Sequence, residues 1–199
     1  MNYLKKKRIK NNLRYSWPLY ILSTAVISIV FVMIFSVTHK LPAYKQLTIF
    51  ISGEVHDPKG LKQDLLTKYE DKELKSVTLI SALPDDGHYS TKLSVPGYNT
   101  ADVLIIPESK LADLNLSYFA LGLDDELVTS YYPNCVIFGQ DGVDYGIQLN
   151  KELVKSYIGL PNEDCYLFLN GGSQNLGEYS NKPVKEHDLA LQLVKYWGL

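Results

Sequence analysis

Hydrophobic positions divide the chain into two parts with different patterns. Residues 17–37 read WPLYILSTAVISIVFVMIFSV and contain no charged side chain. A helix of that length reaches about 32 Å, enough to cross the hydrocarbon core of a bilayer. We therefore predict a transmembrane helix over residues 16–38. After a short linker, residues 39–46, shorter apolar runs alternate with amphipathic segments, which predicts one α/β domain over residues 47–199.

The first half of this domain predicts a mostly parallel sheet. Continuous apolar runs at 47–52, 76–83 and 101–107 are typical of strands that are covered on both faces. Between the first two runs, Asp57 and Pro58 provide a helix cap and a first helical residue. The order strand, helix, strand, connection, strand indicates parallel strands joined by right-handed crossovers.

The second half predicts a hairpin and two helices. The dipeptide 141–142, Asp-Gly, separates two apolar segments and is typical of a tight two-residue hairpin turn. We expect a helix over residues 149–158 and a strand over residues 164–170. A closing amphipathic helix follows, whose apolar face runs from Leu189 to Trp197.

The charges indicate which side of a membrane each part occupies. Residues 1–40 carry seven Lys or Arg and no acid, whereas the rest holds 13 bases and 22 acids, a net charge of −9. Basic flanks stay in the cytoplasm, so we predict a single-pass protein of the cell membrane with a cytoplasmic segment 1–15 and an extracytoplasmic domain. A cleaved signal peptide is the alternative, although the apolar run is long and no Ala-x-Ala site follows. The acidic domain argues against nucleic-acid binding.

The sequence shows no recognisable catalytic, metal or cofactor motif. Gly171–Asn175 reads GGSQN and lacks the second flanking glycine of a nucleophile elbow, and we interpret it as a surface turn. Asp85, Asp86 and His88 are interpreted as a solvated turn. Cys135 and Cys165 have no ligand at zinc spacing; free thiols are slightly favoured, and a disulfide stays open. We predict a protein that is not an enzyme and needs no cofactor.

Several segments together resemble a known family. LTIFISGEV from Leu47, SVTLISAL from Ser76 and ADVLIIPESKL from Ala101 are similar to the first lobe of the extracellular solute-binding proteins of ABC transporters. QDGVDYGIQL resembles the place where those proteins cross between lobes, with Gln148 where a proline is usual. The resemblance implies one periplasmic-binding-protein-like lobe. The family inserts a second lobe after this crossing, and only residues 149–163 are available here.

The predicted topology selects candidate ligand-binding residues, because open parallel sheets bind ligands beyond the carboxyl ends of their strands. The resemblance implies that the same loops meet the ligand. The candidates that follow the first, second and third strands are, in order, Ser52, Gly53 and Glu54, then Asp85, then Glu108 and Ser109.

Three functions are compatible with these features. The first is a membrane-anchored, noncatalytic binding or accessory module, held in lipid by residues 16–38 and associated with a membrane protein such as a permease. The second is a structural or assembly subunit of a membrane complex, and a cell-surface hydrolase is third. A cavity of about 300 Å³ or more at the strand ends favours ligand binding, whereas a flat apolar patch favours assembly. Whether a small molecule binds stays open; for a single lobe we expect about millimolar affinity or weaker.

Overall fold

The chain forms two compact units, residues 1–41 and 42–199. A computed structural model describes residues 3–38 and 41–198. The first unit contains one helix, α1 (Tyr3–Thr38). Residues 17–36 of it have a mean hydropathy of 2.4 and no buried side chain, so this helix is long and apolar enough to cross a membrane. Parts of the predicted basic segment (1–2) and linker (39–40) lie outside the described residues.

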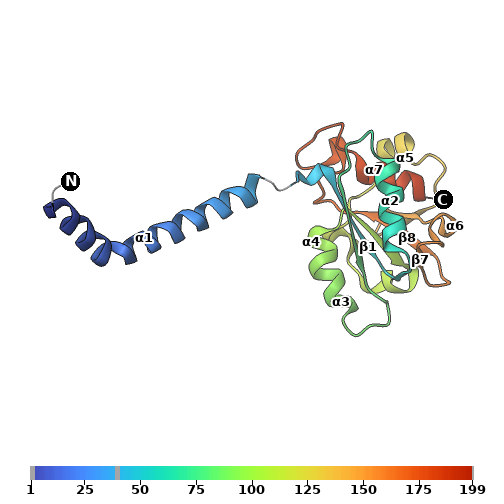
Figure 1. The fold of residues 1–199 in the computed structure, drawn as a ribbon. Coiled ribbons are helices and arrows are strands. Elements are labelled where there is room, and N and C mark those ends of the chain that lie inside the picture. Colours follow the sequence, from blue (N-terminus) through green and yellow to red (C-terminus); the bar gives the residue numbers. More distant parts are fainter. Residues whose placement is uncertain (1–2, 39–40, 199) are drawn as a thin grey trace. The chain divides into compact units, whose positions relative to one another are not determined.

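Pro18 occupies a different place from the expected one. We expected it at the N-terminal end of the apolar helix, but it lies inside α1 because the helix begins at Tyr3. An internal proline removes one backbone hydrogen bond and bends a helix. Figure 1 shows α1 changing direction in its N-terminal half.

The second unit is an α/β domain built on one sheet, in line with a single lobe of the kind that the sequence predicts. The described residues form a six-stranded sheet in the order β3-β1-β4-β8-β6-β5. β3, β1 and β4 are parallel, whereas β8, β6 and β5 each pair antiparallel with their neighbours. Four of the six strands, β3, β1, β4 and β6, thus run in one direction. The strands are β1 (Gln46–Ile51), β3 (Ser76–Ser81), β4 (Val103–Pro107), β5 (Ile137–Gln140), β6 (Val143–Gln148) and β8 (Cys165–Leu169).

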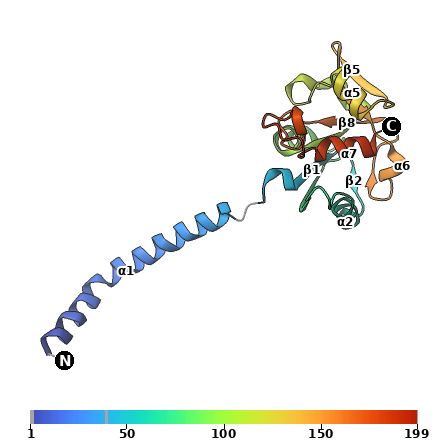
Figure 2. The same cartoon turned by 90° about the horizontal axis from the view of Figure 1, so that it is seen from above.

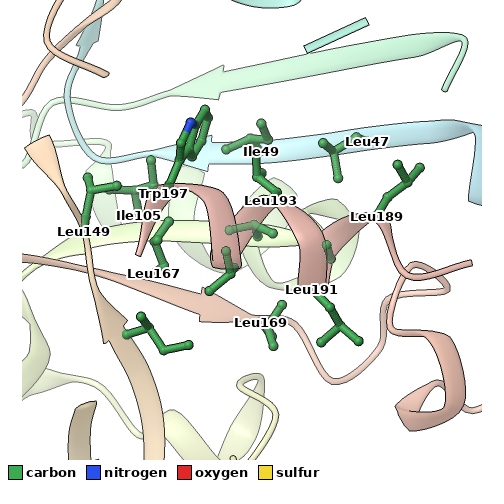
Figure 3. Close-up of a cluster of buried hydrophobic side chains, with 14 of the residues drawn as sticks. Leu47, Ile49, Ile105, Leu149, Leu167, Leu169, Leu189, Leu191, Leu193 and Trp197 are labelled. Atoms are coloured by element: carbon green, nitrogen blue, oxygen red, sulfur yellow. The ribbon is translucent and has the colours of Figure 1, made fainter. Parts of the chain in front are cut away.

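Helices and apolar clusters cover both faces of the sheet. On one face, α2, α7 and α5 lie side by side over the strands (Figure 2). Side chains of α7 meet those of β1, β4 and β8 there (Figure 3). The segments before and after β4, residues 89–101 and 108–119, cover the other face with residues such as Leu93 and Phe119. The helices are α2 (Pro58–Lys68), α3 (Tyr89–Lys92), α4 (Tyr98–Thr100), α5 (Asp125–Tyr131), α6 (Lys151–Val154) and α7 (Leu189–Trp197).

The predicted core is confirmed. Residues 104–106 of β4 and the alternate residues Leu47, Ile49 and Ile51 of β1 are fully buried, and the two strands are neighbours in parallel pairing. Fully buried aliphatic side chains each contribute about 1.5–3 kcal/mol to folding. These central strands therefore hold the domain together.

Local signals in the sequence start and stop elements as expected. The Asp57 carboxylate accepts a hydrogen bond from the Gly60 N–H at 2.9 Å, and α2 begins at Pro58. Asp141 and Gly142 both have positive φ, 54° and 79°. That backbone twist matches two antiparallel strands. The predicted helix start and hairpin are both confirmed.

The expected helix over residues 149–158 is wrong. Asn150 caps α6, but that helix ends at Val154. The chain then extends into β7 (Ile158–Gly159), which pairs antiparallel with β2 (Glu54–Val55). Pairing with a segment about 100 positions away in sequence competes successfully with the local helical pattern.

The loop after β8 also differs from its prediction as a surface turn. Ser173 and Asn175 are 6% and 1% exposed. The carboxylate of Asp102 accepts hydrogen bonds from the Thr48 N–H at 2.7 Å, from the Asn175 amide at 3.1 Å and from the Ser173 hydroxyl. Burial raises the pKa of Asp102 above its ordinary value. This polar network fixes the loop to the edge of the sheet where β1 and β4 begin.

The chain enters the domain through an ordered turn. A 3₁₀ turn at Ala43–Lys45 precedes β1, and the Tyr44 ring stacks on His187 with 3.8 Å between centroids. Lys45 forms an ion pair with Glu73. Residues 43–45 of the predicted linker are therefore part of the folded domain.

Candidate ligand-binding cleft

Three parallel strands end at the same edge of the sheet, beside a cavity. β1, β3 and β4 have their carboxyl ends there. The cavity has a volume of about 570 Å³ and lies between the loops that follow these strands. It is lined by Gly53, Glu54, Leu83, Pro84, Asp85, Asp86, Ser109, Lys110, Gly159, Leu160, Pro161 and Glu163. We call it the strand-end cleft.

The structure brings together four of the six candidate residues. Gly53, Glu54, Asp85 and Ser109 line the strand-end cleft, each from the loop where the sequence placed it. Their role in binding stays a prediction. Glu108 does not line this cleft; it is exposed, and its backbone N–H donates to Asp164 O at 2.9 Å.

Ser52 lies beneath the cleft and does not line it. Its side chain is fully buried, and its hydroxyl oxygen is 2.8 Å from the hydroxyl of Tyr89. Burial raises the pKa of Tyr89. The Ser52–Tyr89 pair thus satisfies two buried hydroxyl groups, which makes Ser52 a structural residue.

The second wall of the cleft comes from the short insertion after β6. β7 pairs with β2, and the loop after β7 supplies Leu160, Pro161 and Glu163. The backbones approach closely: a Cβ at Gly53 would lie 2.5 Å from Gly159 O. Because no side chain fits there, glycine is required at position 53 for this wall to stand against the end of β1.

Two polar contacts hold this wall in place. The carboxylate of Glu163 accepts hydrogen bonds from the Ser109 N–H at 2.7 Å and from its hydroxyl at 2.8 Å. The Lys151 ammonium donates to Pro161 O at 3.1 Å and to Glu163 O. The insertion is therefore fixed to the 3₁₀ turn after β4 on one side and to α6 on the other, so the cleft has two walls.

The cleft is acidic. Its charged side chains are the carboxylates of Glu54, Asp85, Asp86 and Glu163 and the single ammonium of Lys110. The pKa of Asp86 is lowered, first by a hydrogen bond from the His88 backbone N–H and then by Lys92, whose ammonium lies 3.1 Å from it. Asp86 therefore stays ionised at neutral pH.

A second cavity of about 480 Å³ adjoins the cleft. The two share Pro84, Asp86 and Lys110. Tyr89 and Tyr98 also line the second cavity and add aromatic surface. Sequence reasoning missed Lys110, Glu163 and both tyrosines as lining residues. The strand-end rule did point to the loop of Lys110, but no local pattern marks the other three.

The described residues contain no group of three or more side chains that could hold a metal ion. Both cysteines are free thiols; Cys165 is buried and Cys135 half-buried. Burial raises the pKa of Cys165 to about 11 and also raises that of Cys135. Neither thiol is thus activated as a nucleophile. The Ser173 hydroxyl donates to Asp102 within the buried network.

No family model and no curated protein sequence matches the chain. Among solved structures, it is similar to the Tp0737 protein of Treponema pallidum, with 25% sequence identity over 56% of this chain and a TM-score of 0.35. It is also similar to the maltose/maltodextrin-binding domain MalE of Bdellovibrio bacteriovorus bound to maltotriose, with 16% identity over 52% of this chain and a TM-score of 0.37. The matches cover 31% and 28% of those chains. Structural similarity at these TM-scores says nothing about function, so the cleft is interpreted from its own geometry.

Proposed function

We propose that this chain is a membrane-anchored, extracytoplasmic binding module without catalytic activity, which associates with a transporter such as a permease or with another cell-surface protein. The observation that carries the proposal is the cavity of about 570 Å³ at the carboxyl ends of the parallel strands. Ligand sites are typically concave and a few hundred Å³ or larger. A concave site at this position supports binding over a purely structural role.

The charges of the cleft support a ligand with cationic or hydroxyl groups. Four carboxylates and one ammonium line it. Carboxylates accept hydrogen bonds from hydroxyl groups and attract ammonium or guanidinium groups. An amine, a basic peptide segment or a polyhydroxylated molecule fits this lining, whereas a phosphate is repelled by it.

The size of the second wall supports modest affinity for a free solute. This wall consists of one short loop, so it covers less of a small ligand than a complete second lobe does. We expect dissociation constants of about 1 mM for isolated small molecules, because little area is removed from water to offset the cost of association. A tether in the same membrane raises the local concentration of a partner, so weak contacts suffice there.

Titration calorimetry of the full-length chain in detergent micelles tests the cleft. Amines, amino acids, sugars and short basic peptides are the probes. We expect weak binding of at least one of them, and we expect Glu54→Gln to weaken it. Glu126→Gln, an exposed acid on α5 outside the cleft, is the matched control. A dissociation constant below about 10 μM for a free small solute would contradict the argument that the short second wall buries too little of the ligand.

Affinity purification from the native membrane tests the association. We expect a membrane protein to co-purify with the wild type and with Glu126→Gln, and to be lost from a chain carrying Glu54→Lys and Asp85→Lys. Equal recovery with all three chains would contradict binding through the cleft and would favour the structural-subunit function.

Protease added to intact cells tests the anchoring. The basic flank of the apolar run supports a cytoplasmic N-terminus. We expect digestion of the domain from about residue 46 onward, with residues 1–15 protected. Complete protection of the domain while the cells remain intact would refute the orientation.

A further inference from the structure

β3 is an outer strand of the sheet with one side unpaired. Among the described residues, β1 is its sole partner strand. The Ala82 N–H donates to Ile51 O at 3.0 Å, toward β1. Consecutive residues of a strand direct their backbone polar groups to alternate sides. Val77, Leu79 and Ser81 therefore direct theirs to the outer side, where no described residue bonds them.

This edge lacks the features that usually prevent pairing with another chain. Residues 76–83 read SVTLISAL, without a charged side chain or a proline, and the six-residue pairing of β3 with β1 contains no bulge. Natural edges are usually protected by charges, prolines or bulges. The opposite edge is protected: the pairing of β5 is irregular between Phe138 and Gly139. The Gln140 side chain also bonds to Leu114 O and the Leu116 N–H.

Apolar side chains at the open edge are incompletely covered. Leu79 packs at the margin of the apolar cluster beneath α2 and α7, and Ile80 at the margin of the cluster on the other face. Both are half-buried, and Thr78 beside them is exposed. A strand placed along the edge would cover both margins at once.

We propose that a second copy of this chain pairs with the outer edge of β3 in antiparallel fashion, so that one continuous sheet crosses both copies. A two-fold axis places Leu79 opposite Leu79 of the second copy and Val77 opposite Ser81. The outward groups of these residues then form about six hydrogen bonds, since each facing pair exchanges two.

Charge complementarity identifies the second copy as the occupant. Exposed Lys75 precedes the uncharged segment and exposed Asp85 follows it, and neither forms an ion pair within the described chain. In the proposed register Lys75 lies opposite Leu83 of the second copy, two residues from its Asp85. The antiparallel arrangement brings both pairs of opposite charges together, whereas a parallel two-fold pairing of one strand with itself does not match its donors to acceptors.

Light scattering coupled to size-exclusion chromatography of the full-length chain in micelles tests the proposal. We expect a dimer of the wild type. Thr78→Lys introduces a charge at an exposed edge position and should give a monomer. Lys75→Glu should weaken dimerisation by about tenfold, and Lys75→Glu combined with Asp85→Lys should restore it. Lys59→Glu, an exposed lysine on α2, is the charge-matched control. A monomeric wild type overturns the proposal.

Cross-linking separates this interface from one formed by α1. Leu79→Cys should form a disulfide-linked dimer on mild oxidation, because facing residues of this kind lie about 5.5 Å apart between Cα atoms. Ser130→Cys, exposed on α5 and with the same two native thiols, should not. A dimer that persists in Thr78→Lys, or equal cross-linking of the two cysteine variants, overturns the proposal because the contact then lies elsewhere.

Discussion

Replacing Asp102 by alanine should destabilise the domain by about 3 kcal/mol. The carboxylate accepts hydrogen bonds from the Thr48 N–H and from the side chains of Ser173 and Asn175; the last two residues are buried and Thr48 is half-buried. Leaving a buried donor without a partner costs about 1–3 kcal/mol. The two buried donors and the half-buried Thr48 N–H together make the loss larger, and relief of the desolvated charge offsets part of it. The cost of leaving these donors without a partner is therefore larger than the gain from removing the charge.

The effect should depend on pH with a defined sign. Burial raises the pKa of Asp102 in the folded state, so the folded protein binds this proton more tightly than the unfolded chain. The stability gained from that proton is complete below the unfolded pKa and is lost as the pH rises through the folded pKa. The difference in unfolding free energy between the wild type and Asp102→Ala should therefore be larger at about pH 4 than at about pH 7. The first pH lies near the pKa of an unfolded aspartate and the second lies well above it.

Urea unfolding of the full-length chain in micelles provides the assay. Trp197 is 2% exposed in the core, so its fluorescence reports unfolding of the domain once Trp17 has been replaced by phenylalanine. Glu70→Ala is the control, because Glu70 is exposed and its side chain has no described hydrogen bond. A loss below about 1 kcal/mol, or a difference that grows from pH 4 to pH 7, would refute the reasoning.

Three further outcomes are expected. Ile105→Asp should destabilise the domain by more than about 3 kcal/mol in the same urea assay, because Ile105 is fully buried in β4; an unchanged unfolding curve would contradict the strand assignment. Gly53→Ala should distort the second wall, since the added Cβ meets Gly159 O. Amide hydrogen exchange in β7 should become faster in this variant, while exchange in β4 stays slow. The same β7 exchange rate in the variant and the wild type would argue against a tight contact. The Cys165 thiol, with its pKa raised to about 11, should react slowly with a disulfide reagent at neutral pH in the folded chain; reaction as fast as after unfolding would contradict its burial.

The sequence alone determined the features that arise from nearby residues. Asp57 and Pro58 start α2 because a cap and its helix are adjacent in the chain. Asp141 and Gly142 form the hairpin turn because both tolerate positive φ. The charge-free apolar run predicted a helix able to cross a membrane for the same local reason. Four candidate residues also reached the cleft, because the strand order fixed where their loops end.

Tertiary structure alone decided the second wall of the cleft and the buried network. Residues 149–158 have a helical pattern, yet the helix ends at Val154, and Ile158 pairs with β2 as the first residue of β7. Glu163 meets Ser109 across 54 positions of sequence, and Ser173 meets Asp102 across 71. Local residue patterns do not encode such contacts, because each is stabilised only after the sheet has brought distant segments together and removed water from between them.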